Sequence, residues 1–389
     1  MNFKYYIPTK ILFGRGQLAN LHKEKLPGTR ALIVTTGGRS VVDNGYLART
    51  EEELKAAGCT FVLFNKITAN PDRSEVMDGA ALAKAENCDF IVGLGGGSPI
   101  DAAKAIAVMA TNPGDYWDYM VRGTGGGRPV SVTPLPVVAI TTTAGTGTEA
   151  DPWTVISNAA TGEKFGFGID GTFPVLAVVD PELMLTVPRD YTVFQGFDAL
   201  FHSLEGYLAN IATPISDIFA LKAVSLIAEN LPAAVFDGGD IVARENMALA
   251  NTLSGMVEST SGCISEHALE HILSGVYKNL PHGAGLIMLS VAYFSKITEK
   301  HTSDDRLVEL AKALGNKNAK TPEDFIAALQ KLQQACGADK LKMSDYGIEK
   351  ERLREFAAAA KTQNALSFRL DPCDLSIADC AEIYERSYR

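Results

Sequence analysis

Between residues 90 and 104 the chain reads Phe90-Ile91-Val92-Gly93-Leu94-Gly95-Gly96-Gly97-Ser98-Pro99-Ile100-Asp101-Ala102-Ala103-Lys104. The run 90–94 is apolar throughout, which predicts a strand buried on both faces of a sheet. Glycines follow it, and Pro99 suits the first turn of a helix, so we expect a helix that continues to Met109. A strand that passes through a glycine-rich turn into a helix is typical of a parallel α/β sheet.

The same alternation of strand and helix extends through the first half of the chain. Further buried strands are expected at Ala31–Thr35, Phe61–Phe64, Val137–Thr141 and Leu176–Pro181, and helices at Glu51–Ala57 and Glu75–Glu86. Strands that are apolar on both faces and separated by helices predict a parallel sheet covered on both sides.

The second half has a different character from about Thr192 onward, because its apolar residues recur with helical spacing and strand-like runs almost disappear. Helices are expected at Phe197–Ala209, Ile215–Asn230, Ala243–Val257, Leu307–Leu314 and Pro322–Leu332. The sequence therefore predicts an α/β domain over residues 1–188 and an all-helical domain over 189–389. The boundary is expected near Val187-Pro188-Arg189.

Composition restricts the classes of partner and compartment. The chain has 389 residues and a formal net charge of −10, which argues against a nucleic acid or an anionic membrane as partner. Six cysteines are scattered without paired spacing, which is typical of reduced thiols in a cytosolic protein. The N-terminus lacks the apolar segment of a signal peptide, and we expect no apolar run of membrane-spanning length. A soluble cytoplasmic protein is therefore expected.

Two turns have the composition of phosphate-binding loops. The first is Gly95-Gly96-Gly97-Ser98, in which serine replaces the third glycine of a GxGxxG motif, so this turn alone is weak evidence. The second, Thr141–Glu149, follows the next strand and is rich in threonine and glycine. Two such turns at neighbouring strand ends favour a dinucleotide over an ordinary glycine/threonine hairpin. The Gly123–Gly127 stretch, which neither a buried strand nor a helix flanks, is expected to be a surface loop.

Four of the six histidines fall in two short motifs. Asp198 and His202 are spaced i,i+4, as are His267 and His271, so each pair lies on one helix face. His282 follows, where a helix is expected to start. A carboxylate with several imidazoles suits Fe²⁺ or Zn²⁺, which indicates a catalytic metal site. Five candidates exceed the usual number of protein ligands, and spacing does not decide whether His267 or His271 is the outsider.

The chain resembles the iron-containing (group III) alcohol dehydrogenase family. The resemblance runs from Lys10-Ile11-Leu12-Phe13-Gly14 to about Gly285, through the matching segments Gly95–Lys104, Thr142–Glu149, Asp180-Pro181-Glu182-Leu183, Asp198–His202 and His267–His282. It implies an N-terminal dinucleotide-binding α/β domain and a C-terminal helical domain, with the active site in the cleft between them. The implied activity is reversible hydride transfer between a small primary alcohol or aldehyde and a nicotinamide dinucleotide. A homo-oligomer, a dimer or larger, is expected from the same resemblance.

The resemblance also implies roles for individual residues. The metal ligands would be Asp198, His202, His267 and His282, whereas His271 would lie close to the metal and the nicotinamide without being a ligand. His271 is therefore the candidate catalytic residue that relays a proton. The expected cofactor-binding residues of the two turns are Gly95, Gly96, Gly97 and Ser98 at the pyrophosphate, with Asp101, Thr142, Thr143 and Lys164 as further positions.

The choice between NAD and NADP stays open in the sequence. Gly38 and Arg39 follow the first predicted strand and are expected to meet the adenosine ribose. Arg39 and Ser40 could bind a 2′-phosphate, whereas Asp43 would oppose it.

Other classes of function are compatible with parts of the pattern. A zinc-dependent glycerol or polyol dehydrogenase would use fewer metal ligands, and the presence of His202 favours iron, with zinc as the alternative. A lyase of the dehydroquinate-synthase kind needs a dense basic phosphate site, which the sequence does not indicate. A protein that only stores or senses metal would leave the two glycine/threonine turns unexplained.

Overall fold

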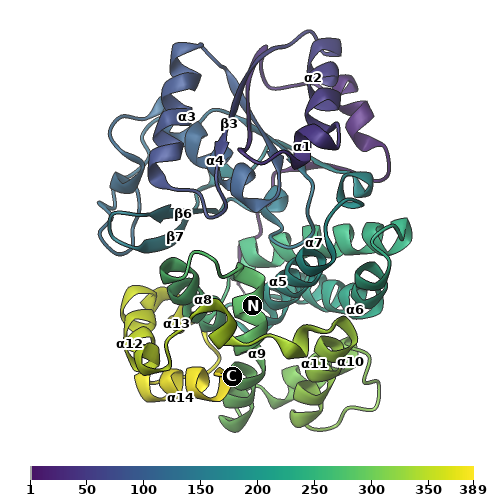
Figure 1. Cartoon of the computed structure of the whole chain (residues 1–389), viewed down its shortest axis with the longest axis vertical. Helices are drawn as coiled ribbons and strands as arrows, with labels where there is room; N and C mark the ends of the chain where they lie inside the picture. The colour runs from purple at the N-terminus through teal and green to yellow at the C-terminus, as the bar shows by residue number, and fades with distance from the viewer. Residues whose placement is uncertain (1) are drawn as a thin grey trace. The chain divides into compact units, whose positions relative to one another are not determined.

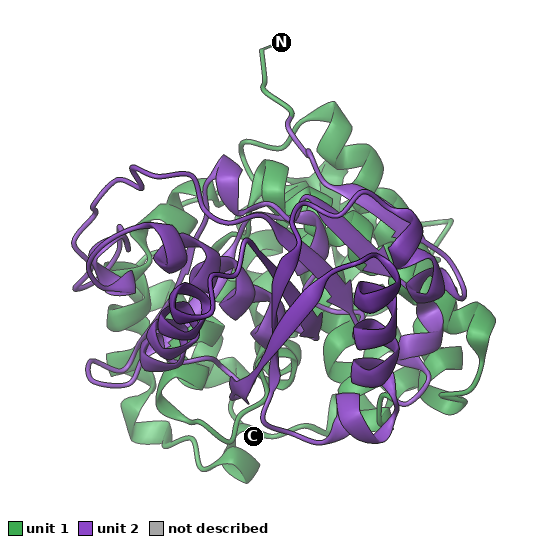
Figure 2. Cartoon of the chain, turned by 90° about the horizontal axis from the view of Figure 1, so that it is seen from above, with its two compact units in different colours: residues 1–5, 187–389 green, residues 6–186 purple. Residues whose placement is uncertain are grey.

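The computed structural model describes residues 2–389, which form two compact units (Figures 1 and 2). The α/β unit comprises Tyr6–Thr186, and the helical unit comprises Val187–Arg389 with the N-terminal residues as far as Tyr5. The predicted boundary at 188/189 lies two residues beyond this division. The N-terminal residues differ from the expectation, since they group with the helical unit, where the Tyr5 ring lies 6.3 Å from the Phe219 ring.

In the described part of the chain, a six-stranded sheet with the order β1-β8-β5-β4-β2-β3 forms the centre of the α/β unit. All of its strand pairs are parallel. The strands are β1 (Lys10–Phe13), β2 (Arg30–Thr36), β3 (Thr60–Ile67), β4 (Phe90–Gly95), β5 (Val137–Thr141) and β8 (Leu176–Val179). The predicted parallel sheet and its five predicted strands are confirmed, whereas the edge strand β1 was not predicted.

Helices cover both faces of this sheet, as the apolar strands predicted. They are α1 (Ser40–Asp43), α2 (Tyr46–Ala56), α3 (Arg73–Ala85) and α4 (Gly97–Thr111). Alternate residues of β2 belong to different apolar clusters: Leu32 packs in the cluster that includes Ile106 of α4, and Ile33 packs in the one that includes Leu54 of α2. The core of this unit therefore lies on both sides of the sheet.

A small antiparallel hairpin, which was not predicted, follows the second phosphate-type turn. It consists of β6 (Thr154–Asn158) and β7 (Glu163–Phe167). The Gly123–Gly127 stretch is a loop, as predicted, and the backbone N–H of Thr124 in it donates to Glu163 at 2.9 Å. The hairpin thus anchors this loop.

The helical unit contains α5 (Arg189–Leu208), α6 (Pro214–Phe236), α7 (Ile241–Ser261), α8 (Ser265–Val276), α9 (His282–Glu299), α10 (Asp304–Ala313), α11 (Glu323–Cys336), α12 (Leu353–Gln363), α13 (Ala365–Leu370) and α14 (Ile377–Ser387). Within residues 2–389 no strand follows Val179, which confirms the predicted change to helical structure. The five predicted helices are confirmed, α9 begins at His282 as expected, and α12–α14 were not predicted. Short 3-10 helices lie at Gln17–Lys23, Tyr116–Asp118, Thr148–Ala150, Asp170–Thr172, Pro181–Met184, Ala338–Lys340, Met343–Tyr346 and Lys350–Arg352.

Among residues 2–389, one helix, α6, is long and apolar enough by length and composition to cross a membrane. This corrects the expectation that no apolar run reaches that length. In the structure α6 packs against α5 and α7 and buries Ala220, Val224 and Ile227. A core helix of a globular protein has the same properties.

Candidate metal and nucleotide sites

Helix α5 presents three ionisable side chains on one face, because Asp198, His202 and Glu205 are spaced i, i+4 and i+7. All three are buried, with exposed fractions of 5%, 5% and 0%. Gly196 allows α5 to approach α6 closely, since a Cβ at this position would lie 2.3 Å from Leu231 Cδ1.

Helices α8 and α9 carry the remaining histidines. His267, Glu270 and His271 lie within α8, and Pro281 precedes the first residue of α9, His282. A Cβ at Gly283 would lie 2.2 Å from the carbonyl oxygen of Phe194, so the first turn of α9 can lie against α5 only because residue 283 is glycine. The chain folds so that the histidines of α8 and α9 meet the face of α5.

Three imidazole nitrogens converge on one oxygen of Asp198. The Nε2 atoms of His202, His267 and His282 lie 3.8, 3.6 and 3.6 Å from Asp198 Oδ1. Within the described residues, neither Asp198 Oδ1 nor His267 Nε2, both buried, has a hydrogen-bond partner. Buried polar atoms are seldom left unpaired, and a divalent ion among these atoms would bond to them. One carboxylate and three imidazoles fit Fe²⁺ or Zn²⁺, so the structure brings together the four predicted metal ligands.

The charge of this cluster favours a cation. Burial alone would raise the pKa of the Asp198 carboxyl, but the imidazoles of His202, His267 and His282 outweigh it and lower the pKa well below its usual range. Asp198 is therefore an anion at neutral pH, which is the form that binds a metal.

Two further buried carboxylates hold two of the imidazoles by the ring nitrogen other than Nε2. Glu205 accepts a hydrogen bond from His267 Nδ1, and Glu270 accepts one from His282 Nδ1. With Nδ1 occupied, each ring directs Nε2 toward Asp198, as outer carboxylates do in metal sites. Both glutamates were missed in the sequence, although Glu205 lies seven residues after Asp198 and Glu270 three after His267, on the same helix faces.

His271 lies beside this cluster but at its edge. Its ring centroid is 5.2 Å from that of His282 and 6.2 Å from that of His267, and the residue is partly exposed. A partly exposed imidazole beside the predicted ligands suits a proton relay, which stays a prediction.

The predicted nucleotide-binding turns belong to the α/β unit and follow three neighbouring strands. Gly38 and Arg39 follow β2, Gly95–Ser98 follow β4, and Thr142-Thr143 follow β5. Because these strands are parallel, the turns lie at one edge of the sheet. The chain order reverses between β2 and β4, which is the place where open α/β sheets bind their ligands.

The turns after β4 and β5 are in close contact. The backbone N–H of Thr142 donates to the carbonyl of Gly95 at 2.9 Å. A Cβ at Gly96 would lie 2.9 Å from Thr143 Cγ2, and one at Gly97 would lie 2.7 Å from Thr146 Cγ2. No side chain caps the N-terminus of α4, whose first N–H groups are therefore available to an anion such as a pyrophosphate.

Asp101 and Lys164, two further predicted cofactor-binding residues, are both buried. Asp101 accepts hydrogen bonds from Thr148 Oγ1 at 2.5 Å and from the backbone N–H of Val155 at 2.9 Å. Both carboxylate oxygens are thus engaged within the protein, so Asp101 anchors the second turn and β6. Lys164 is buried in β7, with 7% exposed. The predicted contacts of these two residues with a cofactor stay predictions.

Arg39, by contrast, is exposed and paired. Its guanidinium donates to Asp43 Oδ1 at 3.1 and 3.2 Å, and 84% of its side chain is exposed. Asp43, the acid that was expected to oppose a 2′-phosphate, therefore pairs with the Arg39 guanidinium, the group that could bind this phosphate.

Comparison with known proteins gives consistent results over the whole chain. Residues 8–181 match the family profile described as iron-containing alcohol dehydrogenase, and residues 192–388 match that of the Fe-containing alcohol dehydrogenase family, C-terminal. The chain is 33% identical over 376 residues to 1,3-propanediol dehydrogenase of Klebsiella pneumoniae, which covers 94% of each chain. It is 35% identical over 365 residues to NAD-dependent methanol dehydrogenase of Bacillus methanolicus, which covers 92% of each chain. The crystal structure of an archaeal halo-thermophilic alcohol dehydrogenase from a Red Sea brine pool matches with a TM-score of 0.94 at 33% identity, over 100% of this chain and 99% of that one.

Proposed function

Since the chain belongs to the iron-containing alcohol dehydrogenase family and thus interconverts alcohols and aldehydes with a nicotinamide cofactor, we propose that it does so with Fe²⁺, NAD and a small primary alcohol. The proposed ligands of the iron are Asp198, His202, His267 and His282. The observation that carries this assignment is the convergence of three Nε2 atoms on the buried Asp198 Oδ1.

When bound by these residues, a divalent ion would supply Lewis acidity, which would lower the pKa of an alcohol hydroxyl and polarise an aldehyde carbonyl. The side chains around it have separate tasks. Asp198 offsets part of the cationic charge, and Glu205 and Glu270 hold two of the imidazoles with Nε2 facing inward. His271, at the partly exposed edge of the cluster, moves the proton between substrate and solvent.

The α/β unit binds the nucleotide in this proposal. The uncapped N-terminus of α4 takes the pyrophosphate, with Gly96 and Gly97 giving it close access to the backbone. Thr142 and Thr143 add hydroxyl contacts from the neighbouring turn. The Arg39–Asp43 pair supports NAD over NADP, since the carboxylate would repel a 2′-phosphate. The name of the Bacillus relative, an NAD-dependent enzyme, supports the same choice.

The proposal extends to the substrate, the assembly and the location. The names of the two relatives support a short-chain alcohol or diol as substrate. We also propose a homo-oligomer in the cytoplasm. All six cysteines are free thiols, which supports a reducing compartment.

The test is a nicotinamide absorbance assay on anaerobically purified, Fe²⁺-loaded protein with a panel of small aldehydes, using NADH and NADPH separately. We expect iron-dependent turnover that is faster with NADH and is lost in His282→Ala. His301→Ala is the matched control, because His301 is exposed and its ring lies beside Asp304, away from the four proposed ligands in the sequence. We expect this variant to keep the activity. Equal turnover in His282→Ala, or a clear preference for NADPH, would overturn the corresponding part of the proposal.

A further inference from the structure

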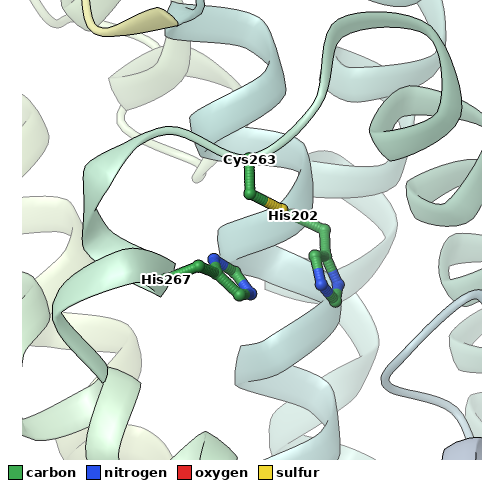
Figure 3. Close-up of side chains that lie close together, drawn as sticks. All are labelled: His202, Cys263 and His267. Atoms are coloured by element: carbon green, nitrogen blue, oxygen red, sulfur yellow. The ribbon is translucent and has the colours of Figure 1, made fainter. Parts of the chain in front are cut away.

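A cysteine outside the predicted ligand set points toward the predicted metal ligands. These ligands, Asp198, His202, His267 and His282, are called the metal cluster below. Cys263 lies in the short link between α7 and α8, and its side chain extends toward His202, with His267 beside it (Figure 3). Gly262 makes this possible, because its φ of +71° is a left-handed conformation that glycine adopts without strain. The Cys263 sulfur and one nitrogen of each imidazole all lie within 4.8 Å of one another.

A further carboxylate lies beside His202. His202 Nε2 lies 3.8 Å from Glu258 Oε2, the same distance as from Asp198 Oδ1. The rings of His202 and His267 are stacked, with centroids 4.6 Å apart and an angle of 24° between their planes. These two histidines therefore face two possible ligand sets, one with Asp198 and His282 and the other with Cys263.

The two sets have different chemistry. One sulfur and two imidazole nitrogens form a set that Zn²⁺ binds well, at about 2.3 Å to sulfur and about 2.0 Å to nitrogen. Tetrahedral ligands at such distances are about 3.5 Å apart, so side-chain adjustments would close the present cluster around an ion. Thiolates select thiophilic metals, whereas carboxylate and imidazole ligands accept Fe²⁺.

We propose that His202, Cys263 and His267 form a second, thiolate-containing metal position that selects Zn²⁺ over Fe²⁺. When Zn²⁺ binds there, a zinc–sulfur bond forms, the thiol proton passes to solvent, and no electrons are transferred. The two positions share His202 and His267, so only one of them is filled at a time. Zinc in the thiolate position therefore excludes iron from the other. This inference concerns metal selection and does not depend on which alcohol the enzyme uses.

The test uses Co²⁺ as a spectroscopic substitute for Zn²⁺ on the metal-free full-length protein, since cobalt bound to a thiolate absorbs strongly in the near ultraviolet. We expect this band in the unmodified protein and its loss in Cys263→Ser. Cys373→Ser, which removes another partly buried thiol, is the matched control and keeps the band. His282→Ala also keeps it, because His282 is not part of the thiolate set.

Affinity and distance measurements complete the test. X-ray absorption of the Zn²⁺ form is expected to show one sulfur at about 2.3 Å. Competition with a chelator is expected to show Zn²⁺ affinity at least about tenfold lower in Cys263→Ser, with Fe²⁺ affinity nearly unchanged.

Three outcomes would overturn the proposal: cobalt bound at one equivalent without the band, the band retained in Cys263→Ser, or equal losses of zinc and iron affinity in that variant. If Cys263→Ser does not fold, the sulfur distance in the unmodified protein and the band in His282→Ala decide the question. Failure of alcohol turnover would not affect these readouts, so the two proposals fail separately.

Discussion

Two buried glutamates determine how the imidazole rings of His267 and His282 are oriented in the metal cluster. Glu205 and Glu270 are completely buried, and each accepts a hydrogen bond from the Nδ1 of one imidazole. The hydrogen bond fixes the tautomer and leaves the Nε2 lone pair for the metal. Both glutamates act through the imidazoles that they hold, so we regard them as positioning residues.

We expect Glu205→Ala to weaken metal binding by about 10- to 100-fold, because His267 loses the partner that orients it. Glu205→Gln should recover most of this loss, since the amide oxygen still accepts from Nδ1. Competitive titration with a chelator measures both constants, and Glu355→Ala, at an exposed position on α12, is the control. A Glu205→Ala protein that binds metal with unchanged affinity would show that the glutamate has no positioning role.

Some residues of the metal cluster and its surroundings could be predicted from the sequence, and others could not. Asp198 with His202, and His267 with His271, were candidates because i,i+4 spacing on a helix is visible in the sequence. Only the family resemblance chose His267 over His271 as a ligand. Glu205 and Glu270 lie on the same faces, but glutamate is common on helices and its partner is set by tertiary contacts. Cys263 was not expected either, because a link between two helices has no periodicity that shows where a side chain points.

The turns that follow β4 and β5 act together as one element, because each leaves room for the other. Gly97 begins α4, and a methyl group at this position would lie 2.7 Å from Thr146 Cγ2. Such a distance is shorter than a normal van der Waals contact, so one of the two turns has to move.

Gly97→Ala is therefore expected to lower the free energy of unfolding by about 1–3 kcal/mol and to weaken NADH binding. The variant Gly97→Ala with Thr146→Ser should recover part of both losses, since serine lacks the Cγ2 methyl. Denaturant titration and NADH fluorescence measure the two effects. Gly166→Ala in β7 is the control, because its Cβ would meet no atom closer than 4.0 Å. The steric explanation fails if the second substitution recovers nothing.

The first residue of α8, Ser265, donates its backbone N–H to a buried acid, Asp371, whose protonation affects stability. Burial raises the pKa of Asp371 to about 7, although hydrogen bonds from Ser265 partly oppose this. The unfolded chain releases this proton near pH 4, so between about pH 4 and 7 the folded state binds the extra proton. The contribution of Asp371 to stability therefore decreases as pH rises through this window and is constant above it.

Asp371→Asn removes this titration while keeping an acceptor for the Ser265 N–H. We expect the variant to gain stability relative to the unmodified protein as pH rises from 5 to 8, with up to about 1.4 kcal/mol for each pH unit within the window. Urea unfolding at several pH values measures the difference. Asp374→Asn, whose side chain is 90% exposed, should show almost no such trend. A difference that stays constant with pH would contradict the assigned pKa.

The strands that could be predicted from the sequence are those whose side chains are buried on both faces of the sheet. The central strands are apolar on both faces, and their bounds agree with the structure to within a few residues. The edge strand β1 has four residues and is only partly buried, and the β6–β7 hairpin alternates polar and apolar residues too briefly to be recognised. Their pairing depends on distant segments, since β1 pairs with β8 across more than 160 residues.

At the scale of the whole molecule, the two kinds of ligand belong to different units. The metal cluster lies entirely within the helical unit, and the nucleotide-binding turns lie within the α/β unit. Each unit has its own core, so a ligand is expected to stabilise mainly the unit that binds it. The two tryptophans, Trp117 and Trp153, both belong to the α/β unit, so tryptophan fluorescence reports on that unit alone. Most of the helical signal in circular dichroism comes from the other unit.

We therefore expect two separable unfolding transitions, as is common in proteins with more than one domain. A divalent metal at 100 times its dissociation constant stabilises the state that binds it by about 2.7 kcal/mol, which raises the midpoint of a domain of this size by roughly 5–10 °C. Metal should move the circular dichroism transition more than the fluorescence transition, whereas NADH should do the reverse. The His282→Ala variant should lose the effect of metal and keep that of NADH, because its nucleotide-binding turns are intact. If both probes shift equally with each ligand, the units unfold as one, and stabilisation by either ligand extends across the whole chain.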